Sequence, residues 1–166
     1  MPILPIRLFG DPVLRTRAAE VDKVDGAVKT LMQSMKETMR SAPGIGLAAN
    51  QIGVLRRVIV WENEEERGSL ANPVIIERDG EVEGEEGCLS LPGLAYPVIR
   101  SQWVLVEGIN ERGKEVTIEA FDLTARIFQH EIDHLNGVLY IDHLPDELRD
   151  EAVATLREMA MAGLVP

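Results

Sequence analysis

The sequence feature that most constrains the fold is a pair of histidines four residues apart in an apolar segment. The stretch His130–His134 reads His-Glu-Ile-Asp-His, with Phe128 before it and Leu135 after it. A helix with apolar residues on more than one side is expected to be buried. Buried imidazoles and a buried carboxylate are costly to desolvate without partners. The chain is therefore expected to fold around this helix and to give its polar side chains a common ligand.

The spacing of the motif favours a metal ion as that ligand. Residues four apart lie about 40° apart around a helix axis, so His130 and His134 project from one face and can bind one ion. Glu131 points roughly 100° away from His130 and can act as a general base. The alternative is a surface helix that these side chains stabilise by local pairing.

The third protein ligand would decide the class of enzyme, because a catalytic site keeps its fourth position for water. A metallopeptidase with three histidine ligands would need a histidine at position 140, which is Tyr140. Downstream, Glu147 and Glu151 are weaker candidates. Upstream, Cys88 is the only cysteine of the chain and follows Gly87 in a polar, turn-like stretch. As a thiolate it would complete a Cys-His-His site, although a lone cysteine can also be a small buried hydrophobe.

A third motif is the glycine-rich stretch 44–51, Gly-Ile-Gly-Leu-Ala-Ala-Asn-Gln. Small residues let a ligand's backbone approach closely, and Gln51 offers an amide that could stabilise an oxyanion. Without other support, such a stretch is more typical of a structural turn between a helix and a strand.

The three motifs together, GIGLAANQ at 44–51, EGCLS at 86–90 and HEIDHLNG at 130–137, resemble the signature motifs of the peptide deformylases in the family's order. The resemblance implies a hydrolase that removes the formyl group from the initiator methionine of new polypeptides. It implies that Cys88, His130 and His134 hold a metal. Glu131 would take a proton from the metal-bound water and deliver it to the leaving amine.

The resemblance also implies oxyanion stabilisation by the Gln51 side chain and the Leu89 backbone N–H. The substrate main chain would pair with Ile45, Gly46 and Gly87 as an added β-strand. For the methionine side chain we expect an apolar pocket near His130, with a wall and a rim formed by Leu123, Ile127, Glu86 and Arg126. Separately, we expect Asp133 to pair with Arg100 and fix the metal helix against the sheet, and His143 to have a surface or capping role.

The donor set suits several metals. Two imidazoles and a thiolate accept Zn²⁺, Fe²⁺, Co²⁺ or Ni²⁺, because selectivity depends on geometry and supply. The resemblance implies Fe²⁺ in the cell, with other divalent ions in purified protein. Two alternatives stay open: the chain could be a zincin-type metallopeptidase, or a non-catalytic interaction module that a metal ion stabilises.

Length and charge bound the remaining choices. The 166 residues suit one domain, and the net charge of −11 opposes tight binding to nucleic acid. We expect N-formylmethionyl nascent peptides as partners, at most transient ribosome contact, and no direct DNA or membrane binding. The N-terminus lacks the pattern of a targeting peptide, so a cytoplasmic location is expected.

The remaining pattern predicts a single α+β domain over 1–166, with mainly antiparallel strands around the HEIDH helix. Helices are expected from Asp25 to Ser41, from Asp122 or Thr124 as cap to Asn136 with Gly137 as terminator, and from Asp146 to Ala162. Short β-rich runs at 57–61, 72–76, 103–106 and 115–118 predict strands, and the last two are expected to form a hairpin through 110–114. The acidic run 62–66 is expected to be a solvated loop.

Overall fold

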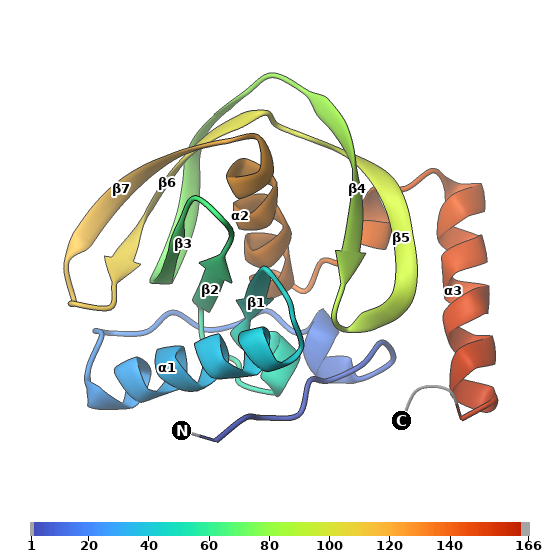
Figure 1. Cartoon of the computed structure of the whole chain (residues 1–166), viewed down its shortest axis with the longest axis horizontal. Coiled ribbons are helices and arrows are strands. Elements are labelled where there is room, and N and C mark those ends of the chain that lie inside the picture. Colours follow the sequence, from blue (N-terminus) through green and yellow to red (C-terminus); the bar gives the residue numbers. More distant parts are fainter. Residues whose placement is uncertain (1, 164–166) are drawn as a thin grey trace.

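The computed structural model describes residues 2–163 and confirms the α+β domain with antiparallel strands around a central helix. In Figure 1 the helix that carries the HEIDH motif, α2, lies in the middle, with strands curving around it. The helix α1 lies along one end of the molecule, and α3 lies beside the β4–β5 pair. The elements in order are α1 (Gly26–Ser41), β1 (Gly46–Ala48), β2 (Val58–Glu62), β3 (Arg67–Asp79), β4 (Val82–Cys88), β5 (Leu91–Arg100), β6 (Trp103–Asn110), β7 (Glu115–Phe121), α2 (Asp122–Leu135) and α3 (Asp146–Met161), with 3₁₀ turns at Pro12–Arg15, Ala49–Ile52 and Tyr140–His143.

The first helix forms where the sequence predicted it. Asp25 caps it, because its side chain accepts a hydrogen bond from the Val28 amide at 3.0 Å. The methionines at helical spacing, Met32, Met35 and Met39, are buried and pack against strands β1 and β2. They are ordinary core residues, because a flexible methionine side chain fills the irregular gaps of a core.

The strands form two separate antiparallel sheets. The larger sheet has the order β1-β2-β3-β6-β7, and the smaller one contains β4 and β5. The predicted hairpin between β6 and β7 is confirmed, with Val106 opposite Ile118 and a turn at Gly113 with φ of 77°. The sequence did not predict β1, β4 or β5, and the stretch around Cys88 that was expected to be turn-like is the end of β4.

The start of α2 differs from the prediction that Asp122 or Thr124 caps it. Phe121 occupies the cap position, and no side chain makes a capping hydrogen bond there. Asp122 is the first helical residue, with φ of 48°, and its carboxylate accepts from the Gln102 side chain at 3.2 Å. The Thr124 hydroxyl accepts from the Asn63 amide at 3.0 Å. Both side chains have tertiary partners, and these replace the local capping bond that sequence reasoning assumed.

The other end of α2 and its packing follow the prediction. The helix ends at Leu135, and Gly137 adopts the left-handed conformation with φ of 75°. Phe128 packs edge-on against Trp61, with ring centroids 4.7 Å apart, in a core cluster that also contains Ala125, Ile132 and Leu135 of α2. No helix within residues 2–163 is long and apolar enough to span a membrane.

Candidate metal centre

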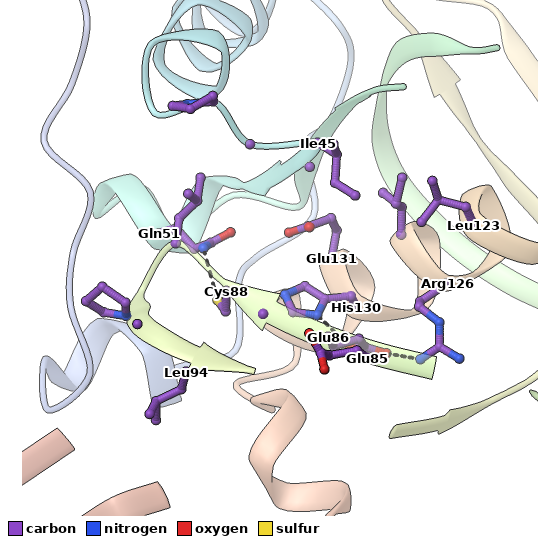
Figure 2. A pocket seen from close by; sticks show the side chains of 18 residues that line it. Ile45, Gln51, Glu85, Glu86, Cys88, Leu94, Leu123, Arg126, His130 and Glu131 are labelled. Atoms are coloured by element: carbon purple, nitrogen blue, oxygen red, sulfur yellow. Dashed lines mark hydrogen bonds and ion pairs between the residues drawn. The ribbon is translucent and has the colours of Figure 1, made fainter. Parts of the chain in front are cut away.

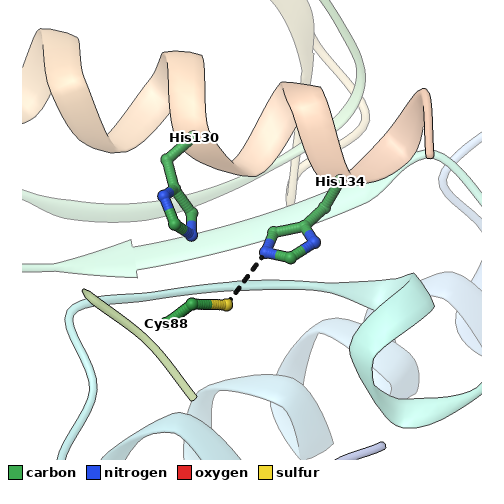
Figure 3. Close-up of side chains that lie close together, drawn as sticks. All are labelled: Cys88, His130 and His134. Atoms are coloured by element: carbon green, nitrogen blue, oxygen red, sulfur yellow. Dashed lines mark hydrogen bonds between the residues drawn. The ribbon is translucent and has the colours of Figure 1, made fainter. Parts of the chain in front are cut away.

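The two histidines of α2 meet the cysteine at the end of β4. The side-chain ligand atoms of Cys88, His130 and His134 all lie within 4.8 Å of one another. Figure 3 shows both imidazoles projecting from successive turns of the helix toward the thiol. Cys88 Sγ is 3.3 Å from His134 Nε2, and the two rings lie edge to face with centroids 5.0 Å apart. These three donors, brought together from distant parts of the sequence, form the metal-binding arrangement typical of a zinc-like site.

The local structure of β4 turns two side chains toward α2. Glu86 and Cys88 are two residues apart in this strand, so they are expected to face the same side. The pairing with β5 is irregular between them, and Cys88 lies opposite Leu91 where the chain reverses. A bulge of this kind re-aims a side chain near the end of a strand. The sulfur of Cys88 therefore reaches the histidine at the far end of the motif.

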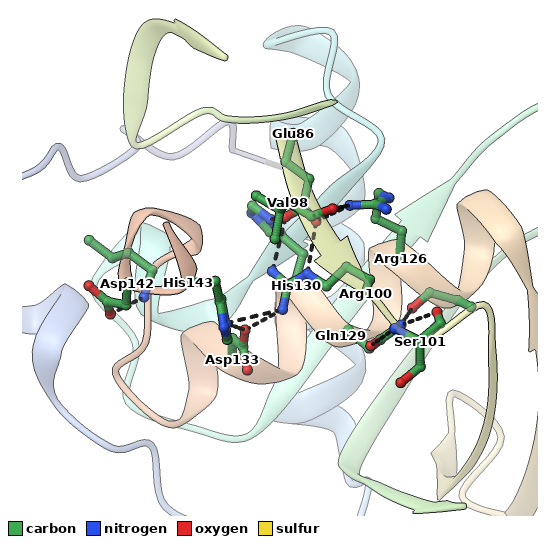
Figure 4. A network of polar contacts seen from close by, with 12 residues as sticks. Glu86, Val98, Arg100, Ser101, Arg126, Gln129, His130, Asp133, Asp142 and His143 are labelled. Atoms are coloured by element: carbon green, nitrogen blue, oxygen red, sulfur yellow. Dashed lines mark hydrogen bonds and ion pairs between the residues drawn. The ribbon is translucent and has the colours of Figure 1, made fainter. Parts of the chain in front are cut away.

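Glu86 is the centre of a buried charge network (Figure 4). Its Oε1 is 2.8 Å from His130 Nδ1, and its carboxylate accepts from Arg100 Nε at 2.8 Å and from Arg126 Nη1 at 2.6 Å. Burial acts to raise the pKa of Glu86, but the hydrogen bonds from Arg100 and His130 outweigh it and hold the pKa well below its ordinary value. The carboxylate expected at the substrate rim does line the cavity, and it is also an ionised partner of the metal helix.

Asp133 forms the second part of this network. Arg100 Nη1 donates to Asp133 Oδ2 at 2.7 Å, which confirms the predicted pair between β5 and the metal helix. His143 Nε2 lies 2.8 Å from the same oxygen, and the His143 side chain is 40% exposed. His143 therefore lies at the surface as expected, outside the group of three metal donors, but it also contacts an acid of the HEIDH motif.

Glu131 is the acid that the sequence analysis predicted to be the general base. It is buried, and its Oε1 has no hydrogen-bond partner within residues 2–163. Burial is the main reason that the pKa of Glu131 is raised to about 7, with a further contribution from the charge of Glu86 and opposition from His130. Figure 2 shows the Glu131 side chain extending from α2 in the direction of Gln51, which lines the same cavity. A buried carboxyl group without a partner and with a pKa near 7 is suited to accept and return a proton.

Gln51 is fixed so that its amide nitrogen faces the cysteine. Its Oε1 accepts from the Ala48 amide at 3.0 Å, while Nε2 donates to Ser90 Oγ at 3.1 Å and lies 3.6 Å from Cys88 Sγ. Sequence reasoning missed Ser90, which is fully buried and orients this amide. Its only signal in the sequence is its place in the EGCLS motif. The amide is thus a preorganised donor next to the ligand cluster.

A cavity of about 540 Å³ opens beside these side chains. Cys88, His130, Glu131 and Gln51 contribute to its wall. The structure also places around it every residue expected to contact substrate, together with Leu89: Ile45, Gly46, Glu86, Gly87, Leu123, Arg126 and Ile127. Ile45 and Leu123 are about half exposed at the cavity, whereas Ile127 is buried. Sequence reasoning did not predict Leu94, which also lines the cavity.

The donors fit a divalent cation. Glu86 occupies His130 Nδ1, so Nε2 is the free ring nitrogen of His130. Burial and the nearby His130 lower the pKa of His134 well below its ordinary value, which favours the neutral, ligating form. Burial also acts to lower the pKa of His130, but the charge of Glu131 and the contacts with Cys88 and Glu86 outweigh it and raise that pKa. This concentration of negative charge favours a bound cation.

Comparison with known proteins places the chain in a family. A family model described as polypeptide deformylase matches residues 3–150. A peptide deformylase of Acidothermus cellulolyticus is 49% identical over 163 residues, which cover 98% of this chain and 91% of the relative. A peptide deformylase of Halothermothrix orenii is 52% identical over 144 residues, covering 86% of this chain and 94% of the relative.

Solved structures agree. A peptide deformylase from Legionella pneumophila superposes with a TM-score of 0.91 at 38% identity, covering 99% of both chains. A peptide deformylase from Ehrlichia chaffeensis in complex with actinonin has a TM-score of 0.92 at 35% identity, covering 95% of this chain and 98% of that one. The chain, with its Cys-His-His donors beside a buried glutamic acid, therefore belongs to the polypeptide deformylase family.

Proposed function

We propose that this protein is a peptide deformylase, which hydrolyses the N-formyl group from the initiator methionine of newly made polypeptides and releases formate. The observation that carries the proposal is Glu131, a buried acid whose Oε1 has no hydrogen-bond partner within residues 2–163 and which lines the same cavity as Cys88 and Gln51. The family membership and the names of the relatives support the same reaction. The two alternatives, a zincin and a non-catalytic module, lack this support.

Cys88, His130 and His134 would hold one divalent ion. When bound, such an ion supplies a Lewis acid that polarises carbonyl and water oxygens. We propose Fe²⁺ in the cell, with Zn²⁺, Ni²⁺ or Co²⁺ able to occupy the same donors in purified protein. A thiolate and two imidazoles accept all four ions, and supply decides between them.

The protein side chains provide the proton transfers and the oxyanion contacts. Glu131 takes a proton from the attacking water, and the remaining hydroxide oxygen bonds to the formyl carbon. The Gln51 amide and the Leu89 backbone N–H donate to the carbonyl oxygen as it gains negative charge. The carbon–nitrogen bond then breaks, and Glu131 returns its proton to the leaving amine. Because Ala48 and Ser90 already hold the Gln51 amide, only its second N–H, which now faces Cys88 Sγ, has to change partner during this step.

The substrate would bind in extended form between β1 and β4. Gly46 begins β1, Ile45 lies just before it, and Gly87 lies in β4. All three line the cavity, and an extended peptide can add to strand edges of this kind through main-chain hydrogen bonds. Leu123 and Ile127 of α2 would form the apolar wall for the methionine side chain. Glu86 and Arg126 line the same cavity, but their charged ends are paired with each other, so they are not free to bind a charged substrate.

We propose one catalytic domain over residues 1–166 that acts on nascent chains in the cytoplasm. The helix α3 carries the acids Asp146, Glu147, Asp150, Glu151 and Glu158 against Arg149 and Arg157. Contact between this helix and ribosomal RNA would be electrostatically unfavourable. Any contact with the ribosome would therefore be transient or would use another surface.

The test is a formate-release assay on formyl-Met-Ala-Ser with protein purified anaerobically and analysed for metal. The wild type should bind one ion per chain and release formate. Glu131→Gln should retain the ion and lose at least about 100-fold in rate, as expected for a general base. Glu65→Gln removes an exposed carboxylate and is the matched control. A wild type that holds one ion per chain but releases no formate would overturn the proposal.

A further inference from the structure

Arg126 was expected at the rim of the substrate pocket, but its guanidinium group makes four hydrogen bonds to the small sheet. We propose that Arg126 is a positioning residue, which passes its guanidinium group through the space left by Gly84 and clamps β4 to α2. The clamp keeps the strand that carries Cys88 in place against the helix that carries His130 and His134. The inference deepens the proposed function, because it concerns the same metal centre.

The hydrogen bonds of Arg126 reach both strands of the small sheet. Nη1 donates to Glu86 Oε2 at 2.6 Å, to the Val98 carbonyl at 2.9 Å and to the Gly84 carbonyl at 3.3 Å. Nη2 donates to the Val82 carbonyl at 2.9 Å. The residue is 9% exposed. The planar fork of an arginine can satisfy several acceptors at once, whereas a lysine would supply a point charge.

Gly84 makes this path possible. A Cβ atom at this position would lie 3.0 Å from Arg126 Nη2 and 3.1 Å from Cζ, closer than ordinary van der Waals contact. Gly84 is not among the residues with positive φ, so its backbone conformation does not require glycine. Space for the guanidinium group is therefore the reason that the structure gives for a glycine here.

The position of the small sheet depends on side-chain contacts. Strands β4 and β5 pair with each other and not with the five-stranded sheet in the described part of the chain. Arg126 lies one helical turn before His130, so Arg126, His130 and His134 share one face of α2. Along that face, Arg126 holds β4 at Val82, Gly84 and Glu86, ahead of the point where Cys88 meets the histidines.

Loss of Arg126 should make the position of β4 relative to α2 less rigid, while the other hydrogen bonds of the charge network remain. Glu86 keeps its bonds to Arg100, at 2.8 and 3.0 Å, when Arg126 is absent. Arg100 also remains bonded to Asp133. We therefore expect the variant Arg126→Leu, which keeps an apolar stem but no guanidinium group, to fold with an altered ligand geometry.

The experiment uses cobalt(II) as the probe in the full-length protein. Affinity is measured by competition with a chelator, and the visible absorption bands of bound Co²⁺ report the ligand geometry. Arg126→Leu should bind Co²⁺ about 10- to 100-fold more weakly than wild type, the range typical of lost contacts behind metal ligands, with shifted bands. Arg126→Lys should restore part of the affinity. Arg149→Leu, which removes a guanidinium paired with Asp146 on α3, should match wild type.

A double-mutant cycle tests the role of Gly84, and its single variant Gly84→Ala keeps the proposal testable if Arg126→Leu folds poorly. Gly84→Ala alone should weaken Co²⁺ binding in the same direction, because the new methyl group displaces the guanidinium group. In the Arg126→Leu background, Gly84→Ala should change the affinity less than about twofold, since coupled residues give non-additive effects. Independent, multiplicative effects, or wild-type affinity and bands in both single variants, would overturn the proposal. These readouts stand apart from catalysis, so a wild type that releases no formate would refute the proposed function alone.

Discussion

Glu86 Oε1 lies 2.8 Å from His130 Nδ1, so a carboxylate of β4 sets the orientation of an imidazole of α2. Such a bond fixes the tautomer of a ligating histidine and increases its basicity. Two arginines, Arg100 and Arg126, hold the same carboxylate, and it stays ionised despite its burial. Residues behind the three metal donors therefore determine the charge balance of the centre.

Glu86→Gln should weaken metal binding by about 10- to 100-fold. An amide has the size of the carboxylate but neither its charge nor its second acceptor oxygen, so the Arg100 guanidinium loses one of its two counter-ions and keeps only Asp133. Chelator competition measures the affinity, and Glu83→Gln, an exposed acid on the same strand, is the control. Equal metal affinities of the two variants would contradict the role assigned to Glu86.

Gly46→Ala should lower the rate of formate release by about 100-fold while the protein keeps its ion. A Cβ atom at Gly46 would overlap Oε2 of Glu131, so the carboxyl group must move. A displacement of about 1 Å at a reacting group can cost about two orders of magnitude in rate. Steady-state kinetics and metal analysis on the same preparation separate the two effects.

The control for that substitution is Gly26→Ala. Gly26 begins α1, and an added Cβ there meets nothing within 4 Å. Alanine is also the better helix former. If Gly46→Ala retained wild-type activity, Glu131 would not need the position that the structure gives it.

Phe128→Ala should destabilise the protein by about 3–5 kcal/mol, the range for large aromatic side chains lost from a core. Phe128 is fully buried and packs against Trp61. Urea unfolding of metal-free protein gives the free energy directly. Phe121→Ala removes an aromatic ring that is 56% exposed, and it should change stability by less than about 0.5 kcal/mol. Similar losses for both variants would show that the core does not centre on α2.

The helices and the two histidine donors could be predicted because their signals are local, whereas Cys88 was assigned from its own motif and the family resemblance. The methionine stripe of α1, with Asp25 as its cap, and the His130–His134 spacing each depend on residues within a few turns of helix. The β6–β7 hairpin has alternating strands and a glycine turn. In each case, the residues that determine the element are neighbours in the sequence.

The small sheet and its charge network could not be predicted in this way. The strand β4, Val82–Cys88, has two glycines and three glutamates, so it lacks the apolar alternation that marks a half-buried strand. Glu86 is buried because Arg126, forty residues later, lies across it. Sequence reasoning put both residues near the pocket but could not show that their charges neutralise each other, because that depends on β4 passing over α2.

Cys88→Ala is the substitution that separates this centre from a site built on the HEIDH motif alone. Removing the thiolate leaves two imidazoles, and we expect metal affinity to fall by more than about 100-fold and formate release to disappear. An ion that binds only the folded state raises its stability according to its concentration and dissociation constant. Adding a chelator to metal-loaded wild type should therefore lower the melting temperature, whereas the chelator should leave Cys88→Ala unchanged. Because the chain has one cysteine, no other thiol can replace it. A Cys88→Ala protein that still binds one ion tightly and still melts lower with chelator would mean that the third donor comes from elsewhere in the chain.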